Sequence, residues 1–174
     1  MQYLKVILFI LLFSSICYGA GLQNVELIRI SDADSFWIRW QGRKVKLIVI
    51  GVDAPEEFKS RKLRMDSKRC HISQKHIRRL GRRATSFAKS ILHKGQLLKV
   101  EIIKVDKRKN KVYGRVYLSD GSSYAEILIK EGYGCVRETD KKLKERLNKQ
   151  LEKAKKEEKG LWKDFYKIMD CLCR

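Results

Sequence analysis

The chain is organised around the stretch Val45-Lys46-Leu47-Ile48-Val49-Ile50-Gly51-Val52-Asp53-Ala54-Pro55-Glu56-Glu57. Its first half is an apolar run rich in β-branched residues, which predicts a buried strand. Pro55 ends this strand because its ring fixes φ and its nitrogen carries no hydrogen. Three carboxylates lie at the strand end, on Asp53, Glu56 and Glu57. Carboxylates at a rigid strand end are suited to hold a hard cation or to position a water molecule.

The overall charge favours a polyanionic partner. The 174 residues include 40 Lys and Arg against 20 Asp and Glu, which gives a formal net charge of +20. Such an excess is typical of proteins that bind nucleic acid or an anionic membrane surface. The length fits one domain with a substantial core. An acidic cluster is out of character in so basic a chain and therefore points to a function.

The N-terminus has the features of a signal peptide. Lys5 supplies a positive charge, residues 6–13 are apolar, and residues 17–19 provide a cleavage site. The apolar run is too short to span a membrane comfortably. We therefore expect residues 1–19 to be removed and residues 20–174 to form a single secreted or periplasmic domain, with no stable membrane anchor.

Four cysteines remain after cleavage: Cys70, Cys135, Cys171 and Cys173. In an exported chain they permit two disulfides. Cys171 and Cys173 are too close in sequence to prefer each other, so we expect one to bond to Cys70 and the other to Cys135, in either order. A zinc site is the alternative interpretation, but His71 and His76 lack a second cysteine pair at ligand spacing.

Short apolar segments separated by turns predict a small barrel. The expected strands are residues 23–30, 36–40, 44–52, 97–105 and 112–118, and the expected helices are residues 84–92, 123–130 and 140–159. This order predicts an α+β fold, a five-stranded OB-fold β-barrel with about three packed α-helices. Residues 58–83 carry eleven Lys or Arg. We interpret residues 58–80 as a basic insertion whose first half is an exposed loop, and residues 161–174 as a cysteine-containing tail.

Acidic residues occur at two of the predicted strand ends. Asp32 and Asp34 precede the second strand, and Asp53 and Glu56 follow the third. Neighbouring strands can bring these ends together, and a cluster of carboxylates suits Ca²⁺. A further carboxylate beside the metal is suited to act as a general base on water. Each acidic residue alone is more often a turn residue bonded to its own backbone, but their combination in a basic protein favours a site.

Arg115 lies near the start of the last predicted strand, in Val112-Tyr113-Gly114-Arg115. A guanidinium group can bind two phosphate oxygens and offset charge that develops at phosphorus. The alternative is an ordinary surface charge. Tyr113 is suited either to stack on a base or to pack in the core.

The order of these motifs resembles the staphylococcal nuclease (thermonuclease) family. The resembling pieces are Asp32-Ala33-Asp34-Ser35, Gly51-Val52-Asp53-Ala54-Pro55-Glu56, Gly81 with Ala84 and Phe87, Tyr113-Gly114-Arg115, and Lys159-Gly160-Leu161-Trp162. The resemblance implies an OB-fold and a Ca²⁺-dependent endonuclease of low sequence specificity. Such an enzyme acts on DNA and RNA, cuts the 5′ P–O bond and leaves 3′-phosphates.

The resemblance also implies roles for single residues. Carried over by position, Asp34 and Asp53 are Ca²⁺ ligands, together with the backbone carbonyl of Ala54. Glu56 is the base that activates the attacking water, and Arg115 binds the phosphate and stabilises the transition state.

One position departs from the family pattern. The family usually has an Arg five residues before the metal-binding Asp53, and here this residue is Ile48. Lys46 lies two residues earlier on the same strand face and is the candidate substitute. Because an ammonium does not reproduce a bidentate guanidinium, we expect reduced activity.

Two other classes of function remain open. The first is a catalytically weak or inactive OB-fold protein that binds nucleic acid. The second is a membrane-active basic protein, which is disfavoured because no strongly amphipathic cationic helix dominates the sequence. In either nucleic-acid class we expect a monomer.

Overall fold

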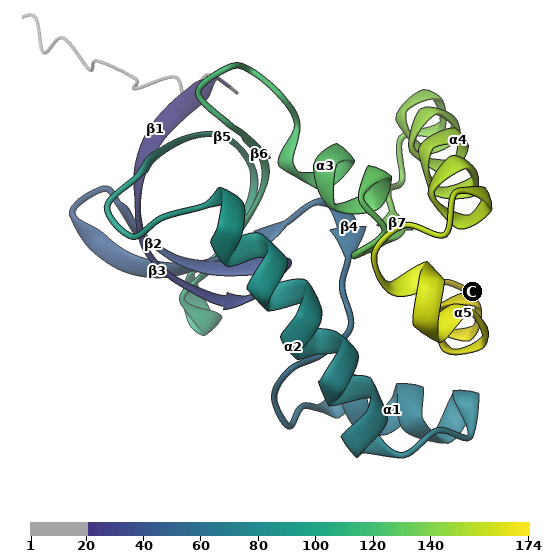
Figure 1. Cartoon of the computed structure of the whole chain (residues 1–174). Coiled ribbons are helices and arrows are strands. Elements are labelled where there is room, and N and C mark those ends of the chain that lie inside the picture. The colour runs from purple at the N-terminus through teal and green to yellow at the C-terminus, as the bar shows by residue number, and fades with distance from the viewer. Residues whose placement is uncertain (1–20) are drawn as a thin grey trace, which may run out of the picture.

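A computed structural model of the chain describes residues 21–174, so the predicted signal peptide lies outside the described residues. Five strands close into a barrel in the order β1-β2-β3-β6-β5, and β4 pairs with β7 in a separate two-stranded sheet. The helices lie on one side of the barrel (Figure 1). This architecture confirms the predicted α+β fold with a five-stranded barrel, although residues 21–174 contain five α-helices instead of about three.

The strands are β1 (Leu22–Asp32), β2 (Ser35–Trp40), β3 (Arg43–Val49), β4 (Gly51–Asp53), β5 (Leu97–Asp106), β6 (Lys111–Tyr117) and β7 (Cys135–Arg137). The helices are α1 (Arg61–Cys70), α2 (Gln74–Ile91), α3 (Tyr124–Lys130), α4 (Lys141–Lys156) and α5 (Leu161–Leu172), and a 3₁₀ turn, η1 (Lys107–Lys109), joins β5 to β6.

Alternation along the strands builds the core. In β3, Val45, Leu47 and Val49 are buried, whereas Lys46 and Ile48 lie on the other face. This is the pattern expected of a barrel strand with one face inward. β3 pairs antiparallel with β2 and parallel with β6, and the parallel pairing closes the barrel. The first half of the strand predicted from the sequence is thus a strand of the barrel wall, paired on both sides.

The third predicted strand, residues 44–52, is two strands in the structure. β3 ends at Val49, and Gly51 has a φ of +101°, a conformation that L side chains rarely adopt. The chain therefore leaves the barrel at Gly51. The short strand β4 then pairs with β7, which places Asp53 opposite Cys135.

The expectation of an exposed loop after residue 58 is wrong, because residues 61–70 form α1. Ser60 caps this helix, since its hydroxyl accepts a hydrogen bond from the Leu63 amide (2.9 Å). The side chain of Leu63 is fully buried. Because Leu63 is the one buried apolar residue of α1, the segment shows no helical periodicity of apolar residues. The sequence pattern therefore does not predict this helix.

The C-terminal tail also forms a helix, α5, which the sequence did not predict. Disulfides join Cys70 to Cys171 (S–S 2.10 Å) and Cys135 to Cys173 (S–S 2.05 Å). They confirm the disulfide interpretation over the zinc site and settle which cysteines pair. Within residues 21–174, no helix has the length and apolar character needed to cross a bilayer.

Candidate active site

Four predicted site residues come together beside the barrel. Asp34 lies in the turn between β1 and β2, and its backbone carbonyl accepts a hydrogen bond from the Val49 amide (2.9 Å). The amide of Ala54 donates to Asp34 Oδ2 (3.0 Å). Asp53 and Glu56 are close enough to Asp34 to raise the pKa of its carboxyl group. The two strand ends identified in the sequence therefore meet in a carboxylate cluster.

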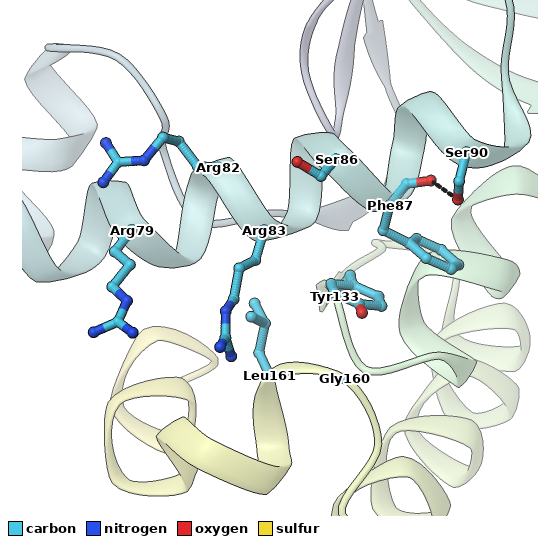
Figure 2. Close-up of a pocket in the computed structure, with 9 residues that line it drawn as sticks. All are labelled: Arg79, Arg82, Arg83, Ser86, Phe87, Ser90, Tyr133, Gly160 and Leu161. Atoms are coloured by element: carbon cyan, nitrogen blue, oxygen red, sulfur yellow. Dashed lines mark hydrogen bonds between the residues drawn. The ribbon is translucent and has the colours of Figure 1, made fainter.

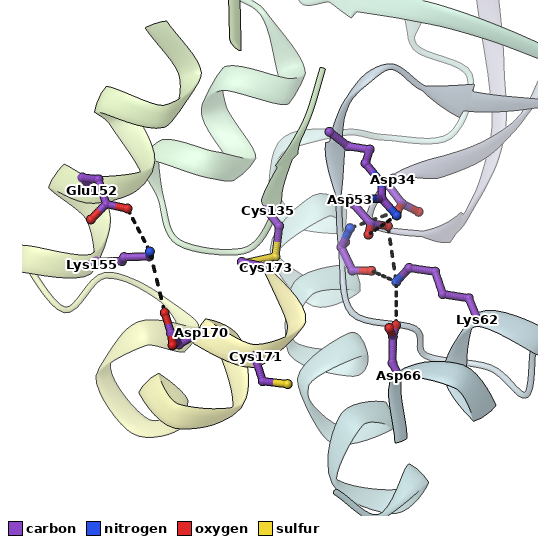
Figure 3. Close-up of a disulfide and its surroundings, with 12 residues drawn as sticks. Asp34, Asp53, Lys62, Asp66, Cys135, Glu152, Lys155, Asp170, Cys171 and Cys173 are labelled. Carbon is purple, nitrogen blue, oxygen red and sulfur yellow. Dashed lines mark hydrogen bonds and ion pairs between the residues drawn. A yellow bond between two sulfur atoms is a disulfide. The ribbon is translucent and has the colours of Figure 1, made fainter. Parts of the chain in front are cut away.

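Lys62 lies in the middle of this cluster (Figure 3). Its Nζ is 3.3 Å from Asp53 Oδ1, 3.6 Å from Glu56 Oε1 and 3.3 Å from Asp66 Oδ2. It also donates a hydrogen bond to the backbone carbonyl of Ala54 (3.3 Å). Sequence reasoning missed both Lys62 and Asp66 because it placed this segment in an exposed loop. The signal that the sequence offers is the spacing of Lys62 and Asp66, four residues apart, which allows an ion pair on one face of a helix.

Burial and mutual repulsion set the protonation of the cluster. Some of Asp34 is exposed, but protein atoms surround its carboxylate, and burial raises its pKa to about 7. Burial also raises the pKa of Glu56, with Lys62 opposing the change. Burial alone lowers the pKa of Lys62, but Asp53, Glu56 and Asp66 outweigh it and the net change is upward. Lys62 is therefore a charged ammonium at neutral pH.

The loop that carries Glu56 is fixed by α2 and β1. Arg78 of α2 donates from Nε to the Glu57 carbonyl (2.9 Å), and Asp32 Oδ1 accepts from the Glu57 amide (3.2 Å). α2 approaches so closely that a Cβ at Gly81 would lie 2.4 Å from the carbonyl carbon of Glu56. Asp32 thus positions the loop through its backbone, and Gly81 is required for the close approach.

Arg115 is held by two other carboxylates. Its Nη2 lies 3.3 Å from Glu138 Oε2, and its Nη1 lies 3.6 Å from Glu101 Oε2. Its Nε is buried and has no hydrogen-bond partner. Within residues 21–174, no ion pair or hydrogen bond joins Arg115 to Asp53 or Glu56. The structure therefore holds Arg115 in ion pairs with Glu101 and Glu138 and does not bring it into contact with the cluster.

The two β3 residues singled out from the sequence share the outer face of the strand. Burial raises the pKa of Asp32, and the nearby charge of Lys46 opposes part of this rise. In the described part of the chain Lys46 forms no ion pair with Asp53 or Glu56. Ile48 is half-buried between Ser35 and Tyr113 on the neighbouring strands. Lys46 and Ile48 thus lie on one face of β3, as expected from the alternation of strand side chains.

A pocket of about 840 Å³ opens beside the cluster, between α1, β7, α4 and α5. Asp53, Lys62 and Glu138 line it, so it connects the cluster with the carboxylate that holds Arg115. Its walls carry five more basic residues: Arg61, Arg69, Arg137, Lys144 and Arg174. A cationic wall beside buried carboxylates is suited to hold a phosphodiester backbone.

A second basic pocket, of about 670 Å³, lies along α2 (Figure 2). It is lined by Arg79, Arg82, Arg83, Ser86, Phe87, Ser90, Tyr133, Gly160 and Leu161, none of which lines the pocket around Asp53. Phe87 and Tyr133 stack there with ring centroids 4.3 Å apart, and Arg83 is paired with Asp164 (2.7 Å). The positive charge of the chain is therefore spread over at least two surfaces.

The donor atoms of the cluster suit a hard cation, because carboxylate and carbonyl oxygens are the ligands that Ca²⁺ prefers. As they stand, however, no three His, Cys, Asp or Glu side chains within residues 21–174 converge to hold a metal ion. The cation that Asp53 and the Ala54 carbonyl share is instead the ammonium of Lys62. The oxygens of Asp53 and Ala54 are therefore of the type that binds Ca²⁺, and in this structure the ammonium of Lys62 contacts them.

A small barrel with carboxylates at two strand ends, a neighbouring arginine and cationic pockets is of the class that binds or cleaves nucleic acids. Residues 45–164 match the family described as Staphylococcal nuclease homologue, which covers more than half of the chain. The chain belongs to this nuclease family. No curated protein matches it significantly.

Proposed function

We propose that the protein is an exported, Ca²⁺-dependent endonuclease that hydrolyses phosphodiester bonds of DNA and RNA. It acts with low sequence specificity and leaves 3′-phosphate products. The observation that carries this proposal is the meeting of Asp34, Asp53, the Ala54 carbonyl and Glu56 beside a cationic pocket. Family membership supports a nucleic-acid substrate.

In the proposed reaction, each residue has a separate task. Asp34, Asp53 and the Ala54 carbonyl would hold Ca²⁺, which supplies positive charge at the scissile phosphate. Glu56 takes the proton of the attacking water, a role favoured by a carboxylate whose pKa is raised toward neutrality. Arg115 offers its two terminal nitrogens to phosphate oxygens. Because Glu101 and Glu138 now hold these nitrogens, the substrate must compete with two carboxylates for them.

Export is supported by the two disulfides, since such bonds persist in oxidising compartments. The predicted signal peptide, residues 1–19, also supports export. We propose that the mature protein is secreted or periplasmic and acts as a monomer, without a stable membrane anchor.

The test is cleavage of single-stranded DNA and RNA by the mature protein, in Ca²⁺ or in a chelator. We expect cleavage in Ca²⁺ only. Glu56→Gln should lower kcat by about 10²-fold or more, because the general base is lost. Glu145→Gln is the matched control, since it makes the same chemical change at an exposed position of α4 that does not line the pocket around Asp53, and it should leave kcat within about twofold of the unaltered protein.

A second candidate function is supported by Ile48, which stands where the family pattern has an Arg. It is a catalytically weak or inactive protein that binds nucleic acid. Its signature is salt-sensitive binding of DNA or RNA without cleavage at any Ca²⁺ concentration. Calcium-dependent cleavage that Glu56→Gln removes would exclude this candidate.

A further inference from the structure

Lys62 contacts two of the three predicted Ca²⁺ ligands. Its Nζ lies 3.3 Å from Asp53 Oδ1 and 3.3 Å from the Ala54 carbonyl oxygen. It also lies 3.6 Å from Glu56 Oε1, the proposed base. One ammonium thus reaches both the proposed metal ligands and the proposed base.

We propose that Lys62 is an internal cation that competes with Ca²⁺ for the carboxylate cluster. The inference rests on the proposed function, because it takes Asp53 and Ala54 to be Ca²⁺ ligands. Ca²⁺ binds oxygen at about 2.3–2.6 Å, so an ion bound to these oxygens would lie within a few ångströms of the Lys62 ammonium, which is 3.3 Å from two of them. The positive charges of Ca²⁺ and the Lys62 ammonium repel each other strongly at so short a distance. Bound Ca²⁺ therefore favours the withdrawal of Lys62 from Asp53 and the Ala54 carbonyl.

α1 offers Lys62 a partner to which it can withdraw. Asp66 lies one helical turn further on, its Oδ2 is 3.3 Å from Lys62 Nζ, and it is largely buried. The Lys62 side chain is 33% exposed and lines the pocket beside the cluster. Lys62 can therefore release Asp53 while it keeps Asp66 and moves toward solvent. Arg69 holds the other oxygen of Asp66 (2.9 Å), which keeps this carboxylate in place.

The competition affects two parts of the site at once. While Lys62 is in place, its ammonium pairs with Asp53 and Glu56 and neutralises part of the negative charge that attracts a metal. When Ca²⁺ displaces it, the base and the metal ligands are released together. Lys62 thus sets the Ca²⁺ concentration at which the site forms, and this threshold is a property of binding, independent of turnover.

The test is the Ca²⁺ affinity of the mature, disulfide-bonded protein, measured by isothermal titration calorimetry at neutral pH. Lys62→Met keeps a long side chain but removes the charge. We expect this variant to bind Ca²⁺ about tenfold or more tightly than the unaltered protein, since one unit of positive charge no longer opposes the metal. Lys68→Met, on the exposed part of the same helix, makes the same change in net charge and should alter the affinity by less than about twofold.

Equal or weaker Ca²⁺ binding by Lys62→Met, when the unaltered protein binds Ca²⁺, would overturn the inference and leave the proposed function intact. If neither protein binds Ca²⁺, the Ca²⁺ dependence in the proposed function is wrong and the inference falls with it. Cleavage assays do not enter either comparison, so a failure of the competition is distinguishable from a failure of catalysis.

A measurement on the unaltered protein covers the case in which Lys62→Met does not fold. Nitrogen-15 NMR detects lysine ammonium groups whose hydrogens are protected by hydrogen bonds. In chelator, the Lys62 ammonium should give a protected signal, because it is held by the Ala54 carbonyl and three carboxylates. Saturating Ca²⁺ should abolish or shift this signal. A Lys62 signal that is unchanged under saturating Ca²⁺ would contradict the competition.

Discussion

Asp34 is the residue of the carboxylate cluster whose ionised form is most strongly destabilised by burial. Burial raises the pKa of its carboxyl group from 3.8 to about 7, and the negative charge of Asp53 adds to this effect. Because the folded pKa exceeds the unfolded one, the folded state binds the proton more tightly. The free energy of unfolding therefore decreases, through this group, as pH rises from about 4 to about 7. In the absence of a divalent cation, the ionised carboxylate destabilises the fold at pH 8.

Asp34→Asn should accordingly raise the Tm at pH 8 in chelator. The amide oxygen can still accept the hydrogen bond from Ala54, and no charge is buried. Each pKa unit corresponds to about 1.4 kcal/mol, and we expect a gain of about 1–2 kcal/mol after relaxation of the site. At pH 3, where Asp34 is protonated in both the folded and the unfolded state, the change should be close to zero. Calorimetry at pH 3 and at pH 8 tests this, and an equal gain at the two pH values would contradict it.

At the scale of elements, the barrel strands could be predicted from the sequence, whereas α1 could not. The barrel strands were predictable because alternating burial imposes an alternating pattern. α1 has five basic residues in ten and depends on a Ser60 cap, one buried Leu and a bond from Cys70 to the tail. These are contacts with distant segments, which a local pattern does not record. The convergence of Asp34 and Asp53 was therefore predictable, whereas the place of Lys62 was not.

The packing of α2 against the loop around Glu56 gives a prediction at the same scale. Gly81→Ala would place a Cβ 2.4 Å from a Glu56 backbone atom, so the loop must move. Alanine gains about 1 kcal/mol in helix propensity, but such overpacking costs about 1–3 kcal/mol. We expect a net loss of stability and a kcat lowered by about tenfold or more, because the proposed base is displaced.

Chemical denaturation and single-stranded DNA cleavage measure the two effects. Lys89→Ala, on the exposed part of α2, is the control and should change neither by much. A Gly81→Ala protein with unaltered stability and kcat would show that the loop around Glu56 does not depend on this contact.

At the scale of the whole molecule, the C-terminal tail shapes the pocket beside the cluster. α5 lies against α1 and α4 (Figure 1), and its two disulfides bind it to α1 and β7. The sequence predicted two bridges to this tail, because exported cysteines pair. It did not predict that the tail is helical, although Leu161, Phe165, Ile168 and Leu172 recur there at helical spacing. It also did not predict that Arg174 lines the pocket, since this depends on the contacts of the tail with distant segments.

The basic wall of this pocket predicts how nucleic-acid binding depends on salt. Arg61 and Lys144 line the pocket and are exposed, and neither is held by an ion pair within residues 21–174. If each binds one phosphate, the double variant Arg61→Gln/Lys144→Gln should lose about two counterion-release events. In a Glu56→Gln background, which prevents cleavage, the slope of log Kd against log salt should fall by about 1.4 for single-stranded DNA.

Lys89→Gln/Lys130→Gln is the matched control, because it removes the same charge from exposed positions outside both basic pockets. It should reduce the slope by much less. The slope distinguishes contact from general attraction, because only cations that bind phosphates directly release condensed counterions, whereas distant charges act through a field that salt screens. Equal slopes for the two double variants would mean that the pocket does not hold the nucleic-acid backbone and that binding follows net charge alone.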